Sequence, residues 1–356
     1  MNKIERYTPD ESGYLSQEDT KSYYSRIGLF CFILGTISFI VSHVIGLVIS
    51  LFFADILIND FVVSIINHAL SFVSIYCIAA PLAFIAIKPL PTARPIKEKF
   101  KFTHLLGTIC VCFAAIQIGS SFSSTLTTIV NTILGRTLEN PVSEILSSGG
   151  LLLNALLVGI FFPILEELLF RRLLCNKLLP LGEKQAVIIS AAMFGLIHGN
   201  LFQFAYAFLL GLVFGYIYVK TGKVIYPIIL HCICNLYSGV FAQYVLTQIP
   251  LEKLEEILNE IISNPALASD FDALWALISP FAFGIALYMV YAYVLMGLAF
   301  AGYIVLIISF IKRKITLEQG ILQVRKENLL ANFFLNGGVA AAIGYIVFTF
   351  LYSIFI

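Results

Sequence analysis

Charged residues are scarce in this sequence. Only 12% of its 356 residues are Asp, Glu, Lys or Arg, whereas 59% are hydrophobic. A soluble domain usually carries about a quarter charged residues, so this deficit excludes a soluble globular protein. It predicts an all-α polytopic integral membrane protein, for which the lipid bilayer is a partner and nucleic acid is not.

The sequence also lacks a disulfide framework and a cleavable signal. Its seven cysteines are odd in number and fall in or beside apolar segments, where they serve as small hydrophobic side chains. The chain opens with 26 mostly polar residues, and the apolar run 27–53 that follows is too long for the core of a signal peptide. We expect this run to remain as a membrane anchor.

Apolar segments follow one another along the whole chain. They span 27–53, 62–87, 104–134, 150–173, 185–198, 201–219, 224–247, 273–311 and 331–356. A spanning helix needs ~20 residues, so segment 185–198 is short. Pro280 is expected to break 273–311, whose first part would lie along the membrane interface. We predict about nine transmembrane helices, with eight to ten compatible with the pattern.

Basic residues alternate between loops in a way that predicts orientation. All but two of the 22 lysines and arginines, Arg136 and Lys253, fall on one side if segment 273–311 crosses once. The positive-inside rule then places the N-terminus in the cytoplasm and the C-terminus outside, in a multi-pass protein of the cell membrane. The inside segments are 1–26, 88–101, 171–184, 220–223 and 312–326.

The chain divides into five parts on this interpretation. A loop at 248–272 is acidic and external, and its stretch LEKLEEILNEII is interpreted as a solvated amphipathic helix. The other parts are a cytoplasmic N-terminal segment (1–26), two transmembrane helices with a basic loop (27–103), a core that carries three polar motifs (104–247) and C-terminal transmembrane helices (273–356).

The first polar motif places two glutamates and two arginines inside the apolar stretch 161–174, FFPILEELLFRRLL. An ionisable group deep in a bilayer costs from ~3 to more than 10 kcal/mol, so these residues need partners or a task. Glu167 and Arg171 are four residues apart and can pair on one helix face. Glu166 points ~100° away and lacks that partner. Glu166 is then available to act as a general base, and Glu167, paired with Arg171, is its supporting neighbour.

Two further motifs carry histidines. In FGLIHGN, residues 194–200, His198 follows Phe194 by four, and the Gly–Asn pair after it indicates a helix that stops inside the membrane. In HCICN, His231 and Asn235 share a helix face and can donate hydrogen bonds to a developing oxyanion.

The three motifs lie at compatible depths. Counting the helical rise from the cytoplasmic flank places Glu166 ~8 Å, His231 ~12 Å and His198 ~20 Å into the membrane. Ordinary helix tilt allows these groups to converge, and a purely structural ionic cluster is the alternative. Other polar residues in the membrane are isolated, and interhelical hydrogen bonds explain them adequately. These residues are His43, His68, His104, Gln117 and Asn154.

At these motifs the chain resembles the CPBP family, which comprises CAAX proteases and bacteriocin-processing enzymes and is also called Abi. The family pattern is E-E-x-x-x-R, F-x-x-x-H and H-x-x-x-N on successive membrane helices, and all three are intact here and in order. The resemblance covers roughly 104–247. It implies an intramembrane endopeptidase similar to the type II CAAX prenyl endopeptidase, acting on hydrophobic, membrane-associated or lipidated proteins.

The resemblance also implies roles for individual residues. It gives Glu166 and His198 the activation of water, His231 and Asn235 the stabilisation of the oxyanion, and Glu167 and Arg171 the support of the site. The cofactor is either none or a divalent metal such as zinc, because Glu166, His198 and His231 are metal-compatible ligands and many members are labelled metalloproteases. The motif H-E-x-x-H is absent, and a Glu–His pair can activate water unaided, which favours a metal-free mechanism.

Two other classes of function are open at this stage. A non-catalytic membrane scaffold or bacteriocin self-immunity protein would keep the fold, but it gains little from five costly polar groups. A secondary transporter would relay protons through Glu166 and His198, but such proteins usually show inverted repeats and paired broken helices. We find no repeat and one broken-helix candidate, at 194–200.

Overall fold

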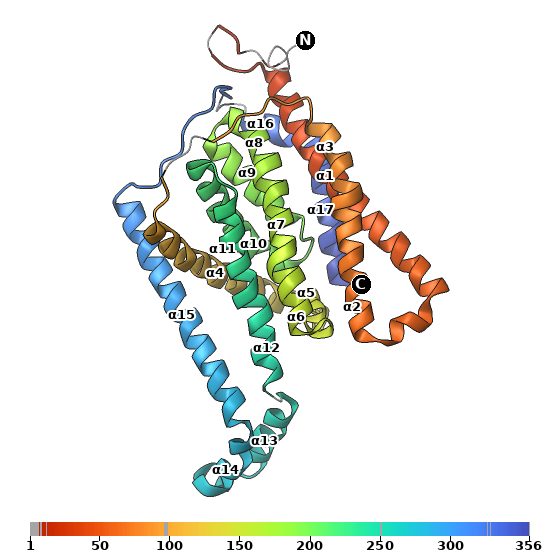
Figure 1. Ribbon diagram of the computed structural model, residues 1–356, viewed down its shortest axis with the longest axis vertical. Helices are drawn as coiled ribbons and strands as arrows, with labels where there is room; N and C mark the ends of the chain where they lie inside the picture. Colours follow the sequence, from red (N-terminus) through yellow and green to blue (C-terminus); the bar gives the residue numbers. More distant parts are fainter. Residues whose placement is uncertain are drawn as a thin grey trace.

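Helices account for all the regular elements of the described chain. The computed structural model describes residues 7, 9–11, 13–95, 99–249, 251–325, 327 and 329–355 (Figure 1). In that part, eight helices are long and apolar enough to cross a membrane. The prediction of an all-α polytopic membrane protein is confirmed, and eight lies within the predicted range.

The eight spans keep the order predicted from the sequence. They are Gln17–Phe52 (α1), Asp60–Ile87 (α2, η2 and α3), Phe102–Leu134 (α4), Gly150–Leu181 (α6 to η5), Leu201–Thr221 (α10), Ile225–Thr247 (α11, η6 and α12), Phe271–Ile311 (α14, η8 and α15) and Gly337–Phe355 (α17). Short helices η1 (Ala54–Ile58), α5 (Pro141–Ser148) and α16 (Leu329–Phe334) connect them.

The ninth predicted segment forms the short helix α9, Glu183–Leu196. Its 14 residues cover only ~21 Å, which is less than a bilayer core. The chain then turns at Gly199, whose φ of 65° suits glycine, and Asn200 caps α10 by accepting the backbone N–H of Gln203 at 3.0 Å. Helix α9 packs against α10 as a hairpin, so the predicted helix stop within 194–200 is confirmed.

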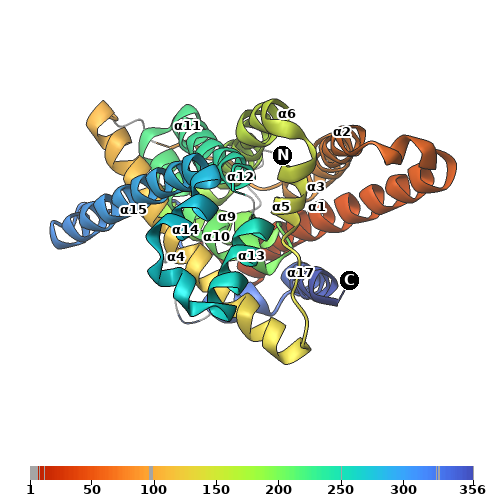
Figure 2. The same cartoon turned by 90° about the horizontal axis from the view of Figure 1, so that it is seen from below.

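The long eighth segment is broken at Pro280, as the sequence predicted. Helix α14 (Phe271–Ile278) ends at the short turn η8 (Ser279–Phe281), which contains Pro280, and α15 (Ala282–Ile311) follows. The predicted amphipathic helix is α13, Leu251–Ser263, and with α14 it projects beyond the bundle (Figure 1), so that both overlie the other helices when seen from below (Figure 2).

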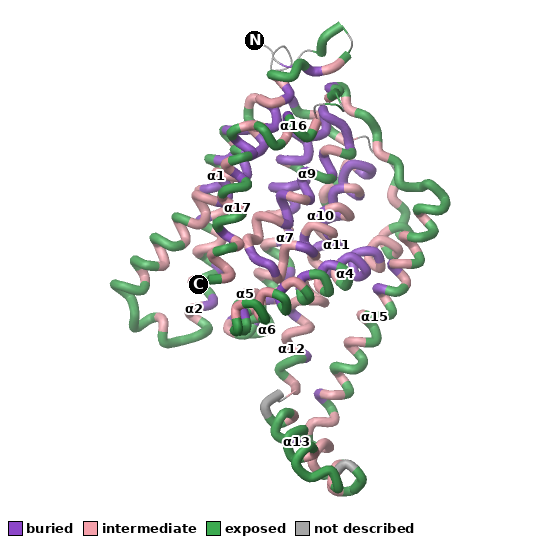
Figure 3. The backbone as a smooth tube through the Cα atoms, turned by 180° about the vertical axis from the view of Figure 1, so that it is seen from behind, coloured by how far each residue is buried: buried purple, intermediate pink, exposed green. Residues whose placement is uncertain are grey.

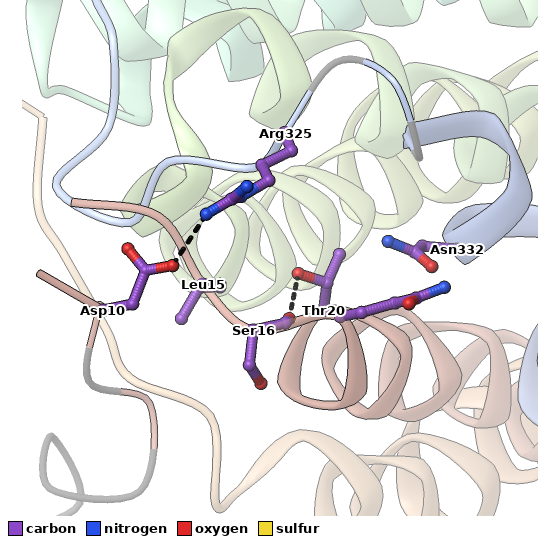
Figure 4. A pocket seen from close by; sticks show the side chains of 7 residues that line it. Asp10, Leu15, Ser16, Thr20, Arg325 and Asn332 are labelled. Atoms are coloured by element: carbon purple, nitrogen blue, oxygen red, sulfur yellow. Dashed lines mark hydrogen bonds and ion pairs between the residues drawn. The ribbon is translucent and has the colours of Figure 1, made fainter. Parts of the chain in front are cut away.

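The loops predicted to be cytoplasmic meet at the end that holds the N-terminus (Figure 1). Glu183 forms an ion pair with Lys220 at 2.7 Å and accepts the backbone N–H of Glu318 at 2.8 Å. A cavity of about 240 Å³ lies here between the N-terminal segment, α1 and α16, beside the Asp10–Arg325 ion pair (Figure 4). Four basic residues of this side lie outside the described residues: Lys3, Arg6, Lys97 and Lys326.

Two basic residues, Arg136 and Lys253, lie outside the segments predicted to be cytoplasmic. Arg136 follows α4 and donates to the backbone carbonyl of Ile354, near the C-terminus, and Lys253 lies on α13. The separation of basic residues in space therefore follows the separation predicted from the sequence.

Small residues let the helices approach closely, as is typical in membranes. A Cβ added at Gly28 of α1 would stand 2.3 Å from the backbone nitrogen of Val339 in α17. Burial is concentrated in the middle of the bundle, along α7 (Phe162–Glu167), α9, α10 and α11 (Ile225–Cys234), as Figure 3 shows. The polar motifs lie on or beside these elements.

Four π-helical segments interrupt the spans. They are η2 (Phe72–Ala79), η3 (Leu157–Phe161), η4 (Leu168–Cys175) and η6 (Asn235–Phe241). Such widened turns often occur at functional sites, because they release backbone carbonyls and re-aim side chains. Two of them flank Glu166 and Glu167, and a third begins at Asn235.

The fold predicts where the chain's single tryptophan meets lipid. Trp275 on α14 is 54% exposed and stacks on Phe271 at 6.4 Å. Because tryptophan prefers the membrane interface, we expect lipids brominated near the headgroup to quench its fluorescence strongly in nanodiscs. Quenching by aqueous iodide with no effect of brominated lipid would contradict an interfacial α14.

Candidate active site

The two adjacent glutamates occupy different environments. Both lie on α7, between the π-helical segments η3 and η4. The side chain of Glu167 is fully buried, whereas that of Glu166 is 24% exposed. The rotation of ~100° between consecutive helical residues explains the difference, because it turns one side chain into the bundle and the other toward accessible space.

Glu167 is held by the predicted ion pair. Its Oε2 lies 2.8 Å from Nε of Arg171, and both side chains are completely buried. The guanidinium also donates through Nη1 to the Ser190 hydroxyl at 3.2 Å and lies 5.2 Å from the ring centroid of Phe194. A buried ion pair needs such additional contacts, because removing both charges from water costs several kcal/mol per ion.

His231 lies between the two glutamates. Its Nδ1 is 3.1 Å from Oε1 of Glu167 and its Nε2 is 3.6 Å from Oε2 of Glu166. Phe194 and Phe214 flank the ring, at 5.6 and 5.2 Å between centroids. The expectation that Glu166 has no partner is therefore wrong, because α11 packs against α7 and brings this imidazole to it.

The contacts of His231 indicate where a proton is held. The carboxylate of Glu167 accepts from Nδ1, which leaves Nε2 facing Oε2 of Glu166. A nitrogen lone pair and a carboxylate oxygen attract each other only when one of them carries a proton. At 3.6 Å the contact between Nε2 of His231 and Oε2 of Glu166 is longer than a hydrogen bond.

His198 has one ring nitrogen, Nε2, that makes no hydrogen bond to the described part of the chain. It lies in the turn after α9, and its Nδ1 is 2.7 Å from the backbone carbonyl of Phe194. A carbonyl only accepts, so Nδ1 carries the hydrogen and Nε2 keeps its lone pair. Glu166 and His231 both lie within electrostatic range of this ring. The structure therefore places His231 at both glutamates and His198 within electrostatic range of Glu166.

Asn235 differs from the expectation. Its Nδ2 donates to the backbone carbonyl of Val158 at 3.0 Å, in the π-helical segment η3. The sequence suggested that His231 and Asn235 act side by side, but His231 turns to the glutamates and Asn235 to this backbone. The difference arises because the widened turn at η3 offers a carbonyl to the nearest donor.

The three metal-compatible residues do not form a metal-binding cluster. In the described part of the chain, no group of three or more His, Cys, Asp or Glu side chains is arranged to hold a metal ion. Glu166 and His231 lie together, but within the described chain His198 completes no three-residue ligand set with them. We therefore derive no step through a metal.

Two tyrosines that no sequence motif marks lie within electrostatic range of the glutamates. Tyr76, on η2, stacks on Phe162 with centroids 6.3 Å apart, and Phe162 lies one turn before Glu166. The charges of both glutamates reach Tyr76, and Glu166 also interacts with Tyr206 on α10. A single tyrosine in an apolar segment has no periodic signature, so no sequence signal identifies either residue.

The fold and site define an integral membrane protein with a buried carboxylate–imidazole centre. Residues 148–237 match the family described as "Type II CAAX prenyl endopeptidase Rce1-like", and this stretch contains all three motifs. The resemblance predicted from the motifs is confirmed for this segment, and the matched family is a protease family.

A curated relative matches part of the chain. Over 104 residues the chain is 30% identical to the UPF0177 protein YxdF from Lactococcus lactis. The alignment covers 29% of this chain and 58% of that relative, so the chain spans little more than half of the relative's length. No solved structure gives a significant match.

The buried ion pair predicts a large loss of stability on mutation. Glu167→Ala leaves the Arg171 guanidinium buried and unpaired, which should cost about 3–5 kcal/mol. We expect a marked drop in the melting temperature of the purified protein. The matched control is Glu256→Ala, which removes the exposed ion pair with Lys253 and should change the melting temperature little. Equal effects of both mutations would contradict the structural role of Glu167.

Proposed function

We propose that the chain is an intramembrane endopeptidase of CAAX type, which hydrolyses peptide bonds of hydrophobic, membrane-associated or lipidated proteins. The observation that carries the proposal is that His231 lies 3.6 Å from Glu166 while His198, in the turn after α9, lies within electrostatic range of it. Glu166 is the partly exposed member of this group, and its neighbour Glu167 is committed to Arg171. The family match over 148–237 supports peptide hydrolysis as the reaction.

Glu166 acts as the general base in the proposed mechanism. A water molecule placed between its carboxylate and Nε2 of His198 gives its proton to Glu166 as the water oxygen attacks the peptide carbonyl carbon. The C–N bond then breaks, and the proton on Glu166 passes to the leaving amine. Atoms balance, because one water is consumed and a new carboxyl and a new amine are formed.

His231 supplies the electrostatic stabilisation. In its imidazolium form His231 donates through Nδ1 to Glu167 and carries a second hydrogen on Nε2, which is only loosely engaged with Glu166 at 3.6 Å and donates to the carbonyl oxygen as negative charge develops there. Asn235 has a second amide hydrogen besides the one bound to Val158 and contributes it to the same oxygen. Glu167 orients the imidazole, and Arg171 and Ser190 hold Glu167 in place.

The mechanism needs no metal ion. A water activated by Glu166 and oriented by His198 requires only the two side chains, and the site residues form no metal-binding cluster within the described chain. The distribution of basic residues supports a cytoplasmic N-terminus and, with it, a site in the cytoplasmic half of the bilayer.

Loss of either water-activating residue should abolish cleavage. We expect Glu166→Ala and His198→Ala to lower activity at least 10²-fold, the usual contribution of general acid–base catalysis. The measurement is mass spectrometry of membrane and secreted peptides from cells that produce the wild-type or the mutant protein. Glu256→Ala serves as the active control. Full activity of both mutants would favour a scaffold function. Protection of cells from a bacteriocin by the Glu166→Ala protein, equal to that by wild type, would favour an immunity function.

Chelation should leave the activity unchanged. Purified protein treated with EDTA and 1,10-phenanthroline should retain its rate, because Glu166 and His198 activate water without a metal. Elemental analysis should find less than one zinc per chain. Loss of activity that added zinc restores would contradict the metal-free mechanism while leaving the endopeptidase assignment in place.

A further inference from the structure

Three helices meet at one corner of the bundle, at the end that holds the N-terminus. Helices α4 and α11 begin at this corner, and α15 ends there (Figure 1). Phe100, just before α4, contacts the ring of Tyr226 in the first turn of α11, with centroids 4.7 Å apart. A Cβ built on Gly107 in α4 would lie 3.7 Å from the side chain of Val305 in α15, and both positions are within two turns of the corner. The three helix ends are therefore neighbours.

Six basic side chains, which we call the basic corner, surround these helix ends. They lie before α4, before α11 and after α15, and all are exposed: Lys99, Lys101, Lys223, Lys312, Arg313 and Lys314. The Lys223 ammonium lies 5.8 Å from the ring centroid of Tyr226, and the Tyr216 hydroxyl donates to the backbone carbonyl of Lys314 at 3.4 Å. No carboxylate of the described chain forms an ion pair with any of the six. Their positive charge is thus available to a partner.

Two helix N-termini add to the positive potential of the basic corner. Helices α4 and α11 both begin without a side-chain cap, and neither has an acidic residue in its first turn. The unpaired N–H groups at a helix start act as about half a positive charge and bind phosphate oxygens readily. The helix starts and the six side chains together favour an anion with several acceptor oxygens.

Exposed apolar side chains lie directly beside these charges. Phe102 is the first residue of α4, Phe310 and Ile311 are the last of α15, and their exposed fractions are 72%, 67% and 75%. Both helices belong to membrane spans, where exposed apolar side chains contact lipid chains. The half-buried Tyr216 and Tyr226 are of the residue type that is enriched at the membrane–water interface. A molecule that uses both surfaces has an anionic head and an apolar tail.

We propose that the basic corner binds the headgroup of an anionic phospholipid, whose acyl chains lie along α4 and α15. Clusters of basic side chains at the membrane surface attract anionic headgroups, and the attraction grows with the number of charges. A zwitterionic lipid brings an ammonium group that the same charges repel. A soluble phosphate would leave the exposed ends of α4 and α15 without a contact. This inference does not depend on the proposed catalytic activity.

The bound lipid would hold the start of a helix that serves the candidate active site. The span Ile225–Thr247 begins at the basic corner and carries His231 and Asn235. His231 lies less than two turns from the start of this span, so a headgroup that fixes the first turn also restrains the helix at the imidazole.

Native mass spectrometry of the purified protein in detergent, titrated with single lipids, tests the proposal. Wild-type protein should bind phosphatidylglycerol about 10-fold or more tightly than phosphatidylcholine. The double variants Lys99→Gln/Lys101→Gln and Lys312→Gln/Lys314→Gln remove charge from two different helices. Each should weaken the binding of phosphatidylglycerol by about 10-fold or more and leave the binding of phosphatidylcholine unchanged.

The matched control removes two charges from the same end of the bundle but away from the basic corner. Lys21→Gln/Lys88→Gln changes α1 and the end of α3 and should leave the affinity for phosphatidylglycerol unchanged. An equal loss in this control would reduce the effect to the general charge of the basic loops and overturn a defined site. Equal affinity of wild-type protein for the two lipids would overturn the proposal without any variant. Displacement of the lipid by an equal concentration of glycerol phosphate would overturn it in favour of a soluble phosphate.

Discussion

The buried ion pair between Glu167 and Arg171 is the interaction on which the site depends. It neutralises two charges inside the membrane and gives Glu167 a fixed position, from which Oε1 holds the imidazole of His231. That contact directs Nε2 of His231 to Glu166, the partly exposed carboxylate. Without Arg171, the buried charge of Glu167 would remain unpaired at a high cost in free energy, and neither Glu167 nor His231 would keep its orientation.

Local relations along a helix were predictable from the sequence, whereas contacts between helices were not. The Glu167–Arg171 pair, the break at Pro280 and the stop near His198 depend on residues that are neighbours in the chain. The placement of His231 between both glutamates depends on how α11 rotates against α7, and the sequence contains no signal of that rotation. The hydrogen bond from Asn235 to the backbone carbonyl of Val158 was also unpredictable, because a π-helical turn exposes this carbonyl at a position that apolar periodicity does not mark.

Polar side chains inside the spans show two different solutions to the absence of bulk water. Around Glu167 the protein satisfies charge with charge, through Arg171 and His231. Around Asn154 it uses a neutral hydrogen bond instead, because the Asn154 amide donates to the backbone carbonyl of Leu146 at 2.7 Å. His68 and Asn154 are isolated polar residues in the sequence, because they lie far apart in the chain and only the fold makes them neighbours.

The central claim is that Glu166 activates water for attack on a peptide bond. The most direct test incubates purified protein in nanodiscs with membranes from cells that lack it, in ¹⁸O-labelled water, and analyses the released peptides by mass spectrometry. The account predicts one ¹⁸O atom in each new carboxyl terminus with wild-type protein and no new termini with Glu166→Gln. Labelled products formed equally by Glu166→Gln would contradict it.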